Sequence, residues 1–187
     1  MLIVSLFYSC ISIVYDDLCY NCSMLKFITP DKIIDHYSDF NPDEFKDKYD
    51  TVLFDLDNTL APYYEKHIDD KARDFIYMLM EKGFKVYVVS NNKEERVKGF
   101  LEGTDIRYTY YSLKPLKTGY KRIIKREKLD PHKIITIGDQ LLTDVIGSKR
   151  MGFYAIYVKP IIDKDSITTV INRKIEKFLF RYVVKKR

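Results

Sequence analysis

Two aspartates that lie two residues apart, Asp55 and Asp57, end the apolar segment VLFDLDNTL at residues 52–60. Burying an unpaired carboxylate is costly. Either the strand ends here and both carboxylates are solvated, or a positive charge lies between them. Two carboxylates at one place can divide a phosphoryl transfer between them. The first attacks phosphorus as a nucleophile, and the second protonates the leaving oxygen and later activates water.

Further polar residues stand where other apolar segments end. In an open parallel sheet, ligands bind outside the carboxyl ends of the strands, so these side chains should converge on one crevice. The residues concerned are Ser90 after 84–90, Lys114 after 106–113, Asp139 after 133–138, and Asp144 at the start of the next helix.

Four carboxylates at such a crevice, Asp55, Asp57, Asp139 and Asp144, cannot all ionise without a counter-ion, because like charges raise one another's pKa. Oxygen ligands without His or Cys favour Mg²⁺ over zinc. Ser90 can donate to a phosphate oxygen and Lys114 can neutralise its charge. A D-x-D pair alone is common on surfaces; the order D-x-D-x-T, Ser, Lys-Pro, G-D-x-x-x-x-D at successive strand ends makes the prediction of a Mg²⁺ and phosphate-ester site specific.

Strands and helices are expected to alternate along the chain. This pattern predicts an α/β fold, a doubly wound, mostly parallel sheet flanked by helices. Strands are predicted at 50–56, 84–90, 106–113, 133–138 and 153–158, and helices at 29–37, 41–45, 68–83, 91–102, 118–130 and 143–152. The first two helices are predicted from Thr-Pro and Asn-Pro, a capping residue before a proline.

Composition indicates one ordinary globular domain: 187 residues, 46% hydrophobic and 32% charged. The net charge of +5 is concentrated in residues 173–187, where seven Lys or Arg oppose one Glu. This argues against a general nucleic-acid binder. All three cysteines lie within the first 22 residues, and Cys19 and Cys22 form one C-x-x-C without a second pair. This is a weak metal signal and fits a reducing compartment.

The two ends of the chain carry separate expectations. Residues 1–15 are apolar but lack a basic n-region and are short for a membrane span. Met24 is therefore expected to be the natural start, with 1–23 a non-native or poorly ordered extension and 24–187 a single domain; the alternative is a membrane anchor. Residues 170–184 predict a basic amphipathic helix, which either lies on an anionic membrane or packs on the domain.

Four motifs, DLDNTL, VVSNN, SLKP and IGDQLLTDVIGSKRMG, resemble those of the haloacid dehalogenase superfamily. The motif sequences GDQLLTD and SNN are most similar to those of its subfamily IIIA phosphatases of the YqeG type. Relatives of that group include phosphatidylglycerophosphate phosphatases. The resemblance covers about residues 24–180 and implies an Mg²⁺-dependent phosphatase with a Rossmann-like core.

The resemblance also implies individual roles. Asp55 would be nucleophile and metal ligand, Asp57 the general acid and base that gives its backbone carbonyl to Mg²⁺, and Thr59 part of the turn. Ser90 and Asn91 would bind phosphate, Lys114 would hold both nucleophile and phosphate, and Asp139 and Asp144 would ligate Mg²⁺.

Neither gap where this superfamily inserts a cap domain is long enough here to hold one, so an open site is expected. An open site admits a bulky phosphate ester or needs a partner chain to exclude water. The function predicted is hydrolysis of phosphatidylglycerophosphate in the cytoplasm, with peripheral contact at the inner face of the membrane and no nucleic-acid partner. Alternatives are a soluble sugar or nucleotide phosphate, and a non-catalytic partner-binding protein; a phospho-accepting receiver has the wrong motif order. The oligomeric state stays open.

Overall fold

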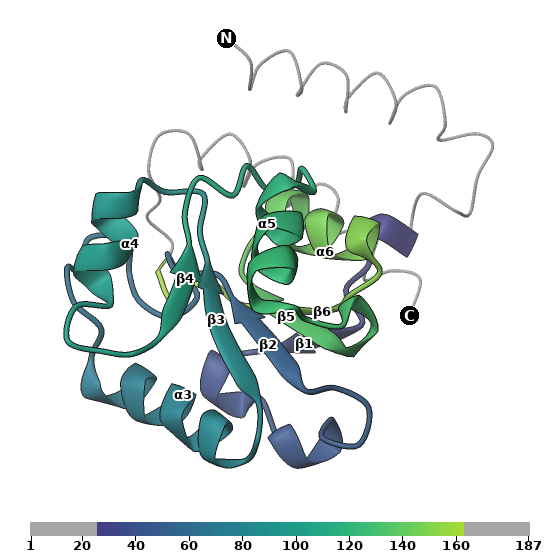
Figure 1. The fold of residues 1–187 in the computed structure, drawn as a ribbon, viewed down its shortest axis with the longest axis horizontal. Helices are drawn as coiled ribbons and strands as arrows, with labels where there is room; N and C mark the ends of the chain where they lie inside the picture. The colour runs from purple at the N-terminus through teal and green to yellow at the C-terminus, as the bar shows by residue number, and fades with distance from the viewer. Residues whose placement is uncertain (1–25, 163–187) are drawn as a thin grey trace, which may run out of the picture.

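The computed structural model describes residues 26–162, so the expected 1–23 extension and the 170–184 helix lie outside it. Six parallel strands form one sheet in the order β1-β6-β5-β2-β3-β4 (Figure 1). The strands are β1 (Lys32–Ile34), β2 (Thr51–Phe54), β3 (Lys85–Val89), β4 (Arg107–Thr109), β5 (Ile134–Gly138) and β6 (Tyr154–Val158). The predicted doubly wound α/β class is confirmed, with all of these strands parallel rather than most.

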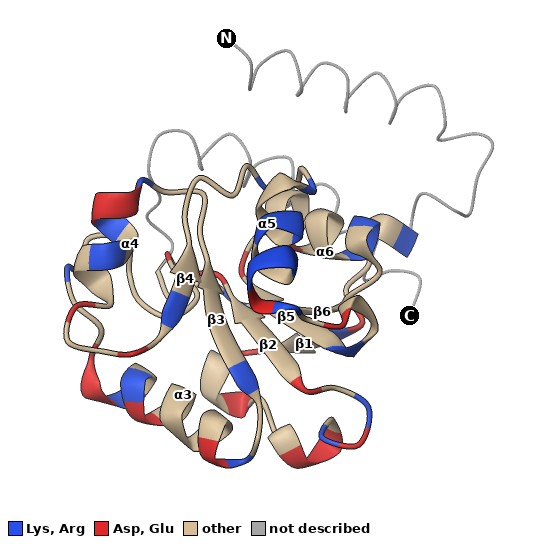
Figure 2. Cartoon of the chain, in the orientation of Figure 1, with Lys and Arg blue, Asp and Glu red and all other residues tan. Residues whose placement is uncertain are grey.

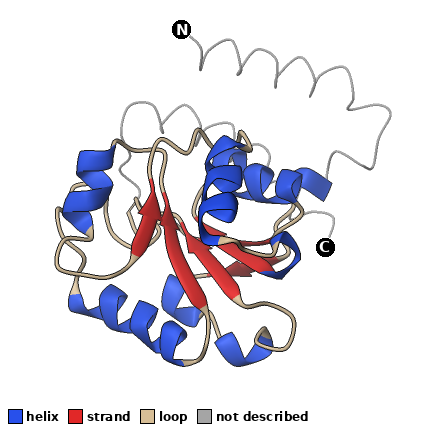
Figure 3. Cartoon of the chain, in the orientation of Figure 1, coloured by secondary structure: helices blue, strands red, loops and turns tan. Residues whose placement is uncertain are grey.

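Helices cover both faces of the sheet (Figure 3). The α-helices are α3 (Asp70–Glu81), α4 (Glu94–Phe100), α5 (Thr118–Glu127) and α6 (Ile146–Met151). Short 3₁₀ turns are η1 (Tyr37–Asp39), η2 (Pro42–Glu44) and η3 (Pro131–Lys133), and a π-helical turn, η4 (Leu141–Val145), precedes α6. The loop 58–69 and the segment 91–113, which holds only α4 and β4, contain no inserted domain, as expected for a capless enzyme.

Side-chain alternation along β2 explains the two layers. Successive strand residues point to opposite faces, so Val52 and Phe54 join the core formed with α3 and α4, while Leu53 joins the core formed with α5. All four β2 residues are buried, because the strand lies between β5 and β3 at the centre of the sheet. A fully apolar strand of this kind is typical of parallel sheets covered on both faces.

The predicted helix over 29–37 is wrong. Residues Lys32–Ile34 form the edge strand β1, parallel to β6, and only a single 3₁₀ turn follows at Tyr37–Asp39. The Thr29-Pro30 pair imitates a helix start. Pairing with a strand about 120 residues later, which no local signal reveals, decides the conformation instead.

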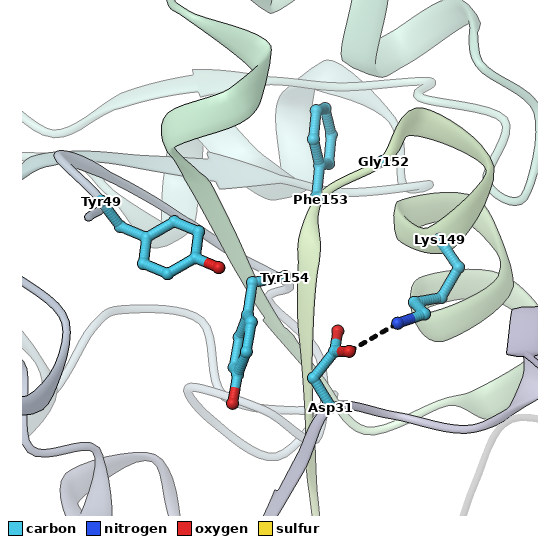
Figure 4. A pocket seen from close by; sticks show the side chains of 6 residues that line it. All are labelled: Asp31, Tyr49, Lys149, Gly152, Phe153 and Tyr154. Atoms are coloured by element: carbon cyan, nitrogen blue, oxygen red, sulfur yellow. Dashed lines mark hydrogen bonds and ion pairs between the residues drawn. The ribbon is translucent and has the colours of Figure 1, made fainter.

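An ion pair anchors this edge strand at the amino ends of the strands, opposite the crevice. The Asp31 carboxylate accepts from the backbone N–H of Ala155 at 2.8 Å and lies 2.6 Å from Lys149 Nζ. Figure 4 shows the pair beside Tyr49 and Tyr154 in an open cavity of about 250 Å³. The Asp31 carboxylate in this cavity is already bonded to Ala155 N–H and Lys149 Nζ, and these bonds anchor β1.

Arginines of α5 cover the other sheet edge, β4. Arg126 donates to the Tyr108 carbonyl at 2.7 Å, and Arg122 donates to the carbonyls of Tyr110 and Tyr111. Figure 2 shows the basic residues along α5. Paired carbonyls leave less open edge for another strand to join, and they also fix the loop that leads to Lys114.

Candidate active site

The turn after β2 presents the two aspartates at the carboxyl edge of the sheet. The N–H of Asp55 donates to the Ile137 carbonyl at 2.9 Å, which continues the ladder to β5. Asn58 adopts a left-handed backbone (φ 63°) and its N–H donates to the Ala61 carbonyl at 2.7 Å, so the chain turns back at once. Asn tolerates this conformation better than most residues, which accounts for its position in the motif.

Lys114 lies at the centre of the site. Its Nζ is 2.5 Å from Asp55 Oδ1 and 2.7 Å from Asp144 Oδ1, and its side chain is only 3% exposed. One carboxylate oxygen from each of Asp55, Asp139 and Asp144 lies within 4.8 Å of the others. Thr59 Oγ1 donates to Asp139 Oδ1 at 3.3 Å, so the motif turn also reaches the end of β5.

The charges of this cluster fit a divalent cation. Three carboxylates against one ammonium leave two negative charges in a buried place, which is the charge that a divalent ion would neutralise. The donors are all carboxylate oxygens, the ligands that hard cations prefer. Asp55, Asp139 and Asp144 are therefore the residues that could hold a metal here.

Burial and neighbouring charges shift the pKa values of the cluster. Burial raises the pKa of Asp55 to about 7, although Lys114 opposes this shift. Burial by itself would lower the pKa of Lys114, but Asp144 and Asp55 outweigh it and hold that pKa above its ordinary value. Burial also raises the pKa of Asp57, against the effect of Arg96. Lys114 thus stays charged, and Asp57 can carry a proton more readily than an exposed aspartate.

Ser90 and Asn91 are tied directly to the Lys114 loop. Ser90 is buried at the end of β3, its carbonyl accepts from Ser112 N–H, and its Oγ accepts from Asn92 N–H at 3.1 Å. Asn91 accepts from the Lys114 N–H at 2.7 Å and donates to the Lys114 carbonyl at 3.1 Å. The Asn91 side chain therefore positions the lysine backbone; a phosphate contact by Asn91 stays a prediction.

A close approach between β5 and η4 places Asp144. Its Oδ2 accepts from the Gln140 N–H at 3.1 Å, and a π-helical turn of this kind is frequent at functional sites. A Cβ on Gly138 would lie 2.5 Å from Asp144 Cγ. Only glycine leaves room for the carboxylate at this point, which explains the glycine before Asp139.

Two residues of the site were missed by the sequence reasoning. Arg96 Nη2, from α4, lies 2.8 Å from Asp57 Oδ1, and Asn92 Nδ2 donates to Asp57 Oδ2. In the sequence they belong to NNKEERVKGF, a stretch of mixed charges that reads as a solvated helix. The structure thus brings Asp55, Lys114, Asp139 and Asp144 into one cluster and pairs Asp57 with Arg96 at its side.

Comparison with known proteins identifies relatives of this chain. The family model of haloacid dehalogenase-like hydrolases matches residues 63–152. "Probable phosphatase YqeG" of Bacillus subtilis (strain 168) is 34% identical over 153 residues, which cover 81% of this chain and 89% of that protein.

Solved structures give weaker likenesses. A putative haloacid dehalogenase-like hydrolase from Bacteroides fragilis matches with 17% identity and a TM-score of 0.49, over 62% of this chain and 90% of that one. An uncharacterized protein from Listeria monocytogenes serotype 4b gives 18% and 0.47 over 62% and 84%. The assignment rests on the first relative: with 34% identity across most of both lengths, this chain belongs to the haloacid dehalogenase-like hydrolases, as its motifs predict.

Proposed function

We propose that this protein is a Mg²⁺-dependent phosphomonoester hydrolase that acts through an aspartyl-phosphate on Asp55 and hydrolyses phosphatidylglycerophosphate in phospholipid synthesis. The observation that carries the proposal is the cluster around Lys114 Nζ, which touches both Asp55 and Asp144 beside Asp139. Family membership and a relative described as a probable phosphatase support the same reaction class.

The reaction would proceed in two displacements. An Asp55 carboxylate oxygen attacks phosphorus, the ester P–O bond breaks, and Asp57 gives its proton to the departing alcohol oxygen. Asp57 then takes a proton from water, the water oxygen attacks phosphorus, and the Asp55–phosphorus bond breaks to release inorganic phosphate. Throughout, Lys114 holds the Asp55 carboxylate and offsets the phosphate charge, and the Ser90 hydroxyl donates to a phosphate oxygen.

Asp55, Asp139 and Asp144, with the Asp57 carbonyl, would hold the Mg²⁺. When bound, Mg²⁺ neutralises charge on the phosphate and lowers the repulsion between a dianionic ester and the carboxylates. Mg²⁺ fits this role because it commonly completes its ligands with substrate phosphate oxygens and water rather than with a full protein cage.

Exposed apolar side chains around the site favour a lipid substrate. Within residues 26–162, four of the five exposed large hydrophobic residues lie in the loops that follow β2 and β4, at the carboxyl edge. We call them the aromatic rim: Tyr63, Tyr64, Tyr111 and Leu113, which are 42%, 58%, 47% and 53% exposed. Tyrosine, with an apolar body and a polar tip, suits a membrane interface. None of the helices within residues 26–162 is long and apolar enough to cross a bilayer.

Backbone strain at two residues of the aromatic rim supports a functional role for this loop. Tyr111 and Leu113 both have a left-handed backbone, with φ of 43° and 54°, which costs a bulky residue about 1 kcal/mol or more. The Tyr111 N–H is held by the Asn92 carbonyl at 2.9 Å, and its own carbonyl by Arg122. We infer that this loop, together with the basic segment 170–184, meets the anionic surface on which the substrate lies.

A substrate panel tests the proposal. The chain from Met24 should release phosphate from phosphatidylglycerophosphate in mixed micelles with Mg²⁺ and not with EDTA. A strong preference for sugar or nucleotide phosphates over the lipid would assign it a soluble substrate, and tight binding to a partner without hydrolysis across the panel would indicate a non-catalytic protein.

Mg²⁺ should stabilise the protein more at pH 8 than at pH 5.5. An unfolded aspartate titrates near about 3.9, whereas burial raises the pKa of Asp55 to about 7 in the folded, cation-free protein. The folded state binds the extra proton between these values, so cation-free stability falls as the pH rises from about 4 to about 7. Mg²⁺ replaces that proton, and at about 100 times its Kd it adds roughly 2.7 kcal/mol.

The measurement is the unfolding midpoint with Mg²⁺ and with EDTA across this pH range. The Mg²⁺ shift should grow by several degrees toward pH 8 in the wild type. Asp55→Asn, which lacks the titrating group, is the control and should show a weaker pH dependence. Equal Mg²⁺ shifts at both pH values in the wild type would contradict a cation site at Asp55.

Replacing Tyr111 and Leu113 by Asn should impair the lipid reaction selectively. Asn accepts the left-handed backbone at both positions, so the double variant reports the loss of the side chains rather than of the loop. Removing this apolar area should lower kcat/KM about tenfold or more for phosphatidylglycerophosphate in micelles. The same constant for p-nitrophenyl phosphate should change less than about twofold.

Phe27→Asn removes an exposed aromatic side chain that precedes β1 and serves as the matched control. It should leave both reactions unchanged. An equal loss on the soluble ester and the lipid in the double variant would show that the aromatic rim supports the site itself and not the lipid.

A further inference from the structure

Arg96 is a second cation beside the site, separate from the Lys114 cluster. Its side chain is 21% exposed and lies 2.8 Å from Asp57 Oδ1. The guanidinium also lies 5.2 Å from the centroid of the Phe100 ring, and Phe100 is fully buried in the core. Contacts on two sides hold the group in place, so it is preorganised.

Most donors of this guanidinium are unused. Arginine offers five N–H groups in a planar fork that matches phosphate or carboxylate oxygens. Within residues 26–162, the hydrogen bond to Asp57 is the one found for Arg96. Asp57 needs no second arginine contact to keep its position, because Asn92 Nδ2 donates to its other oxygen. The remaining N–H groups can therefore serve a ligand.

Arg96 lies on the side of the site where the leaving alcohol of the substrate must bind. Asp57 passes its proton to the alcohol oxygen, so that oxygen must come within a hydrogen bond of the Asp57 carboxylate. Arg96 Nη2 is itself one hydrogen bond from Asp57 Oδ1, which puts it within about 6 Å of the alcohol oxygen when both bond Oδ1 and within about 8 Å when the alcohol bonds Oδ2. The two outer oxygens of an extended glycerol unit are about 5 Å apart, as bond lengths of about 1.5 Å require. An anion on the far hydroxyl of a phosphorylated glycerol would reach the guanidinium.

We propose that Arg96 is a specificity-determining residue that binds a second anionic group on the alcohol side of the ester. The substrate class is a phosphomonoester whose leaving alcohol carries a phosphodiester three carbons away. This inference rests on the proposed phosphatase function. The same headgroup occurs in a phospholipid and in its water-soluble deacylated form, and Arg96 recognises the chemistry that the two share.

The test compares two soluble esters that share a glycerol 3-phosphate unit: glycerol 3-phosphate itself, and glycerophosphoglycerol phosphate, in which that unit also carries a glycerophosphodiester. The wild type should prefer the phosphodiester-bearing ester in kcat/KM. In Arg96→Gln, which keeps a neutral donor toward Asp57, this preference should fall about 10- to 100-fold, mainly through KM. Arg96→Lys should restore part of it. Lys98→Ala, an exposed cation on the same helix, should leave it unchanged.

The outcomes separate the two proposals. A wild type without preference for the phosphodiester-bearing ester overturns the role of Arg96 even if no variant folds. An equal fall in kcat on both esters in Arg96→Gln also overturns it, because Arg96 would then act only by positioning Asp57. Phosphatidylglycerophosphate in micelles distinguishes the lipid from its deacylated form. If Arg96→Gln lowers kcat/KM for the lipid as much as for the deacylated ester, Arg96 recognises the headgroup that the two share. If the wild type hydrolyses neither p-nitrophenyl phosphate nor any of the three esters, the proposed phosphatase function itself is wrong.

Discussion

Asp55→Asn is expected to lower turnover at least about ten-thousand-fold, the scale seen when a nucleophile that acts with its partners is removed. An amide oxygen is a weak nucleophile, and the variant lacks the charge that Lys114 Nζ holds at 2.5 Å. The fold should persist, because the substitution is nearly isosteric. The measurement is kcat for p-nitrophenyl phosphate with saturating Mg²⁺, beside the unfolding midpoint.

Asp70→Asn provides the matched control for this variant. Asp70 is the first residue of α3, its side chain is 82% exposed, and its partner is Arg73 on the same helix. It should retain wild-type turnover. Appreciable turnover in Asp55→Asn, at more than about a tenth of the wild type, would mean that another group attacks phosphorus or that water does so directly.

Lys114→Met is expected to abolish turnover and to destabilise the protein. Its ammonium touches Asp55 and Asp144 in a buried place, so removal leaves carboxylates without their protein counter-charge. Breaking a buried ion pair from one side costs about 3–5 kcal/mol, and methionine keeps the volume of the lysine stem. Added Mg²⁺ should recover part of this loss, because it neutralises the same carboxylates.

Denaturant unfolding with Mg²⁺ and with EDTA checks the second prediction. Lys117→Met, an exposed lysine three residues along, should leave both stability and turnover close to wild type. A Lys114→Met protein as stable as the wild type in EDTA would show that the buried carboxylates carry protons there and do not depend on the lysine.

The convergence of the site could be predicted from sequence because parallel strands share one carboxyl edge. Asp55 and Asp139 come directly after β2 and β5, so knowing these strands was enough to place them together. The strand predicted over 106–113 is too long: β4 ends at Thr109, and a loop with left-handed residues at Tyr111 and Leu113 carries Lys114 to the cluster. Helices with a strong apolar pattern, such as Asp70–Glu81, could be predicted equally well. The individual catalytic roles of these residues stay predictions.

Other features depend on contacts that no local pattern encodes. β1 pairs with β6 across most of the chain, and its three residues follow a Thr-Pro pair that predicts a helix. Arg96 belongs to the site because it donates to Asp57, 39 residues earlier in the sequence. Its immediate neighbours have the mixed charges that are typical of a solvent-exposed helix. The π-helical turn that carries Asp144 looks like ordinary helix in sequence, and its close approach to Gly138 is a contact that the helical pattern does not predict.

The measurement that tests the central claim most directly is trapping the covalent intermediate. With p-nitrophenyl phosphate, whose leaving group departs without a proton, Asp57→Asn should slow mainly the second displacement, since water then lacks its base. A rapid acid quench followed by peptide mass spectrometry should then find one phosphoryl group on Asp55. That modification should be absent when Asp55→Asn is treated in the same way. Phosphate release in a single turnover with no phosphoryl group on any residue, or with the group on a different residue, would contradict Asp55 as the nucleophile of this site.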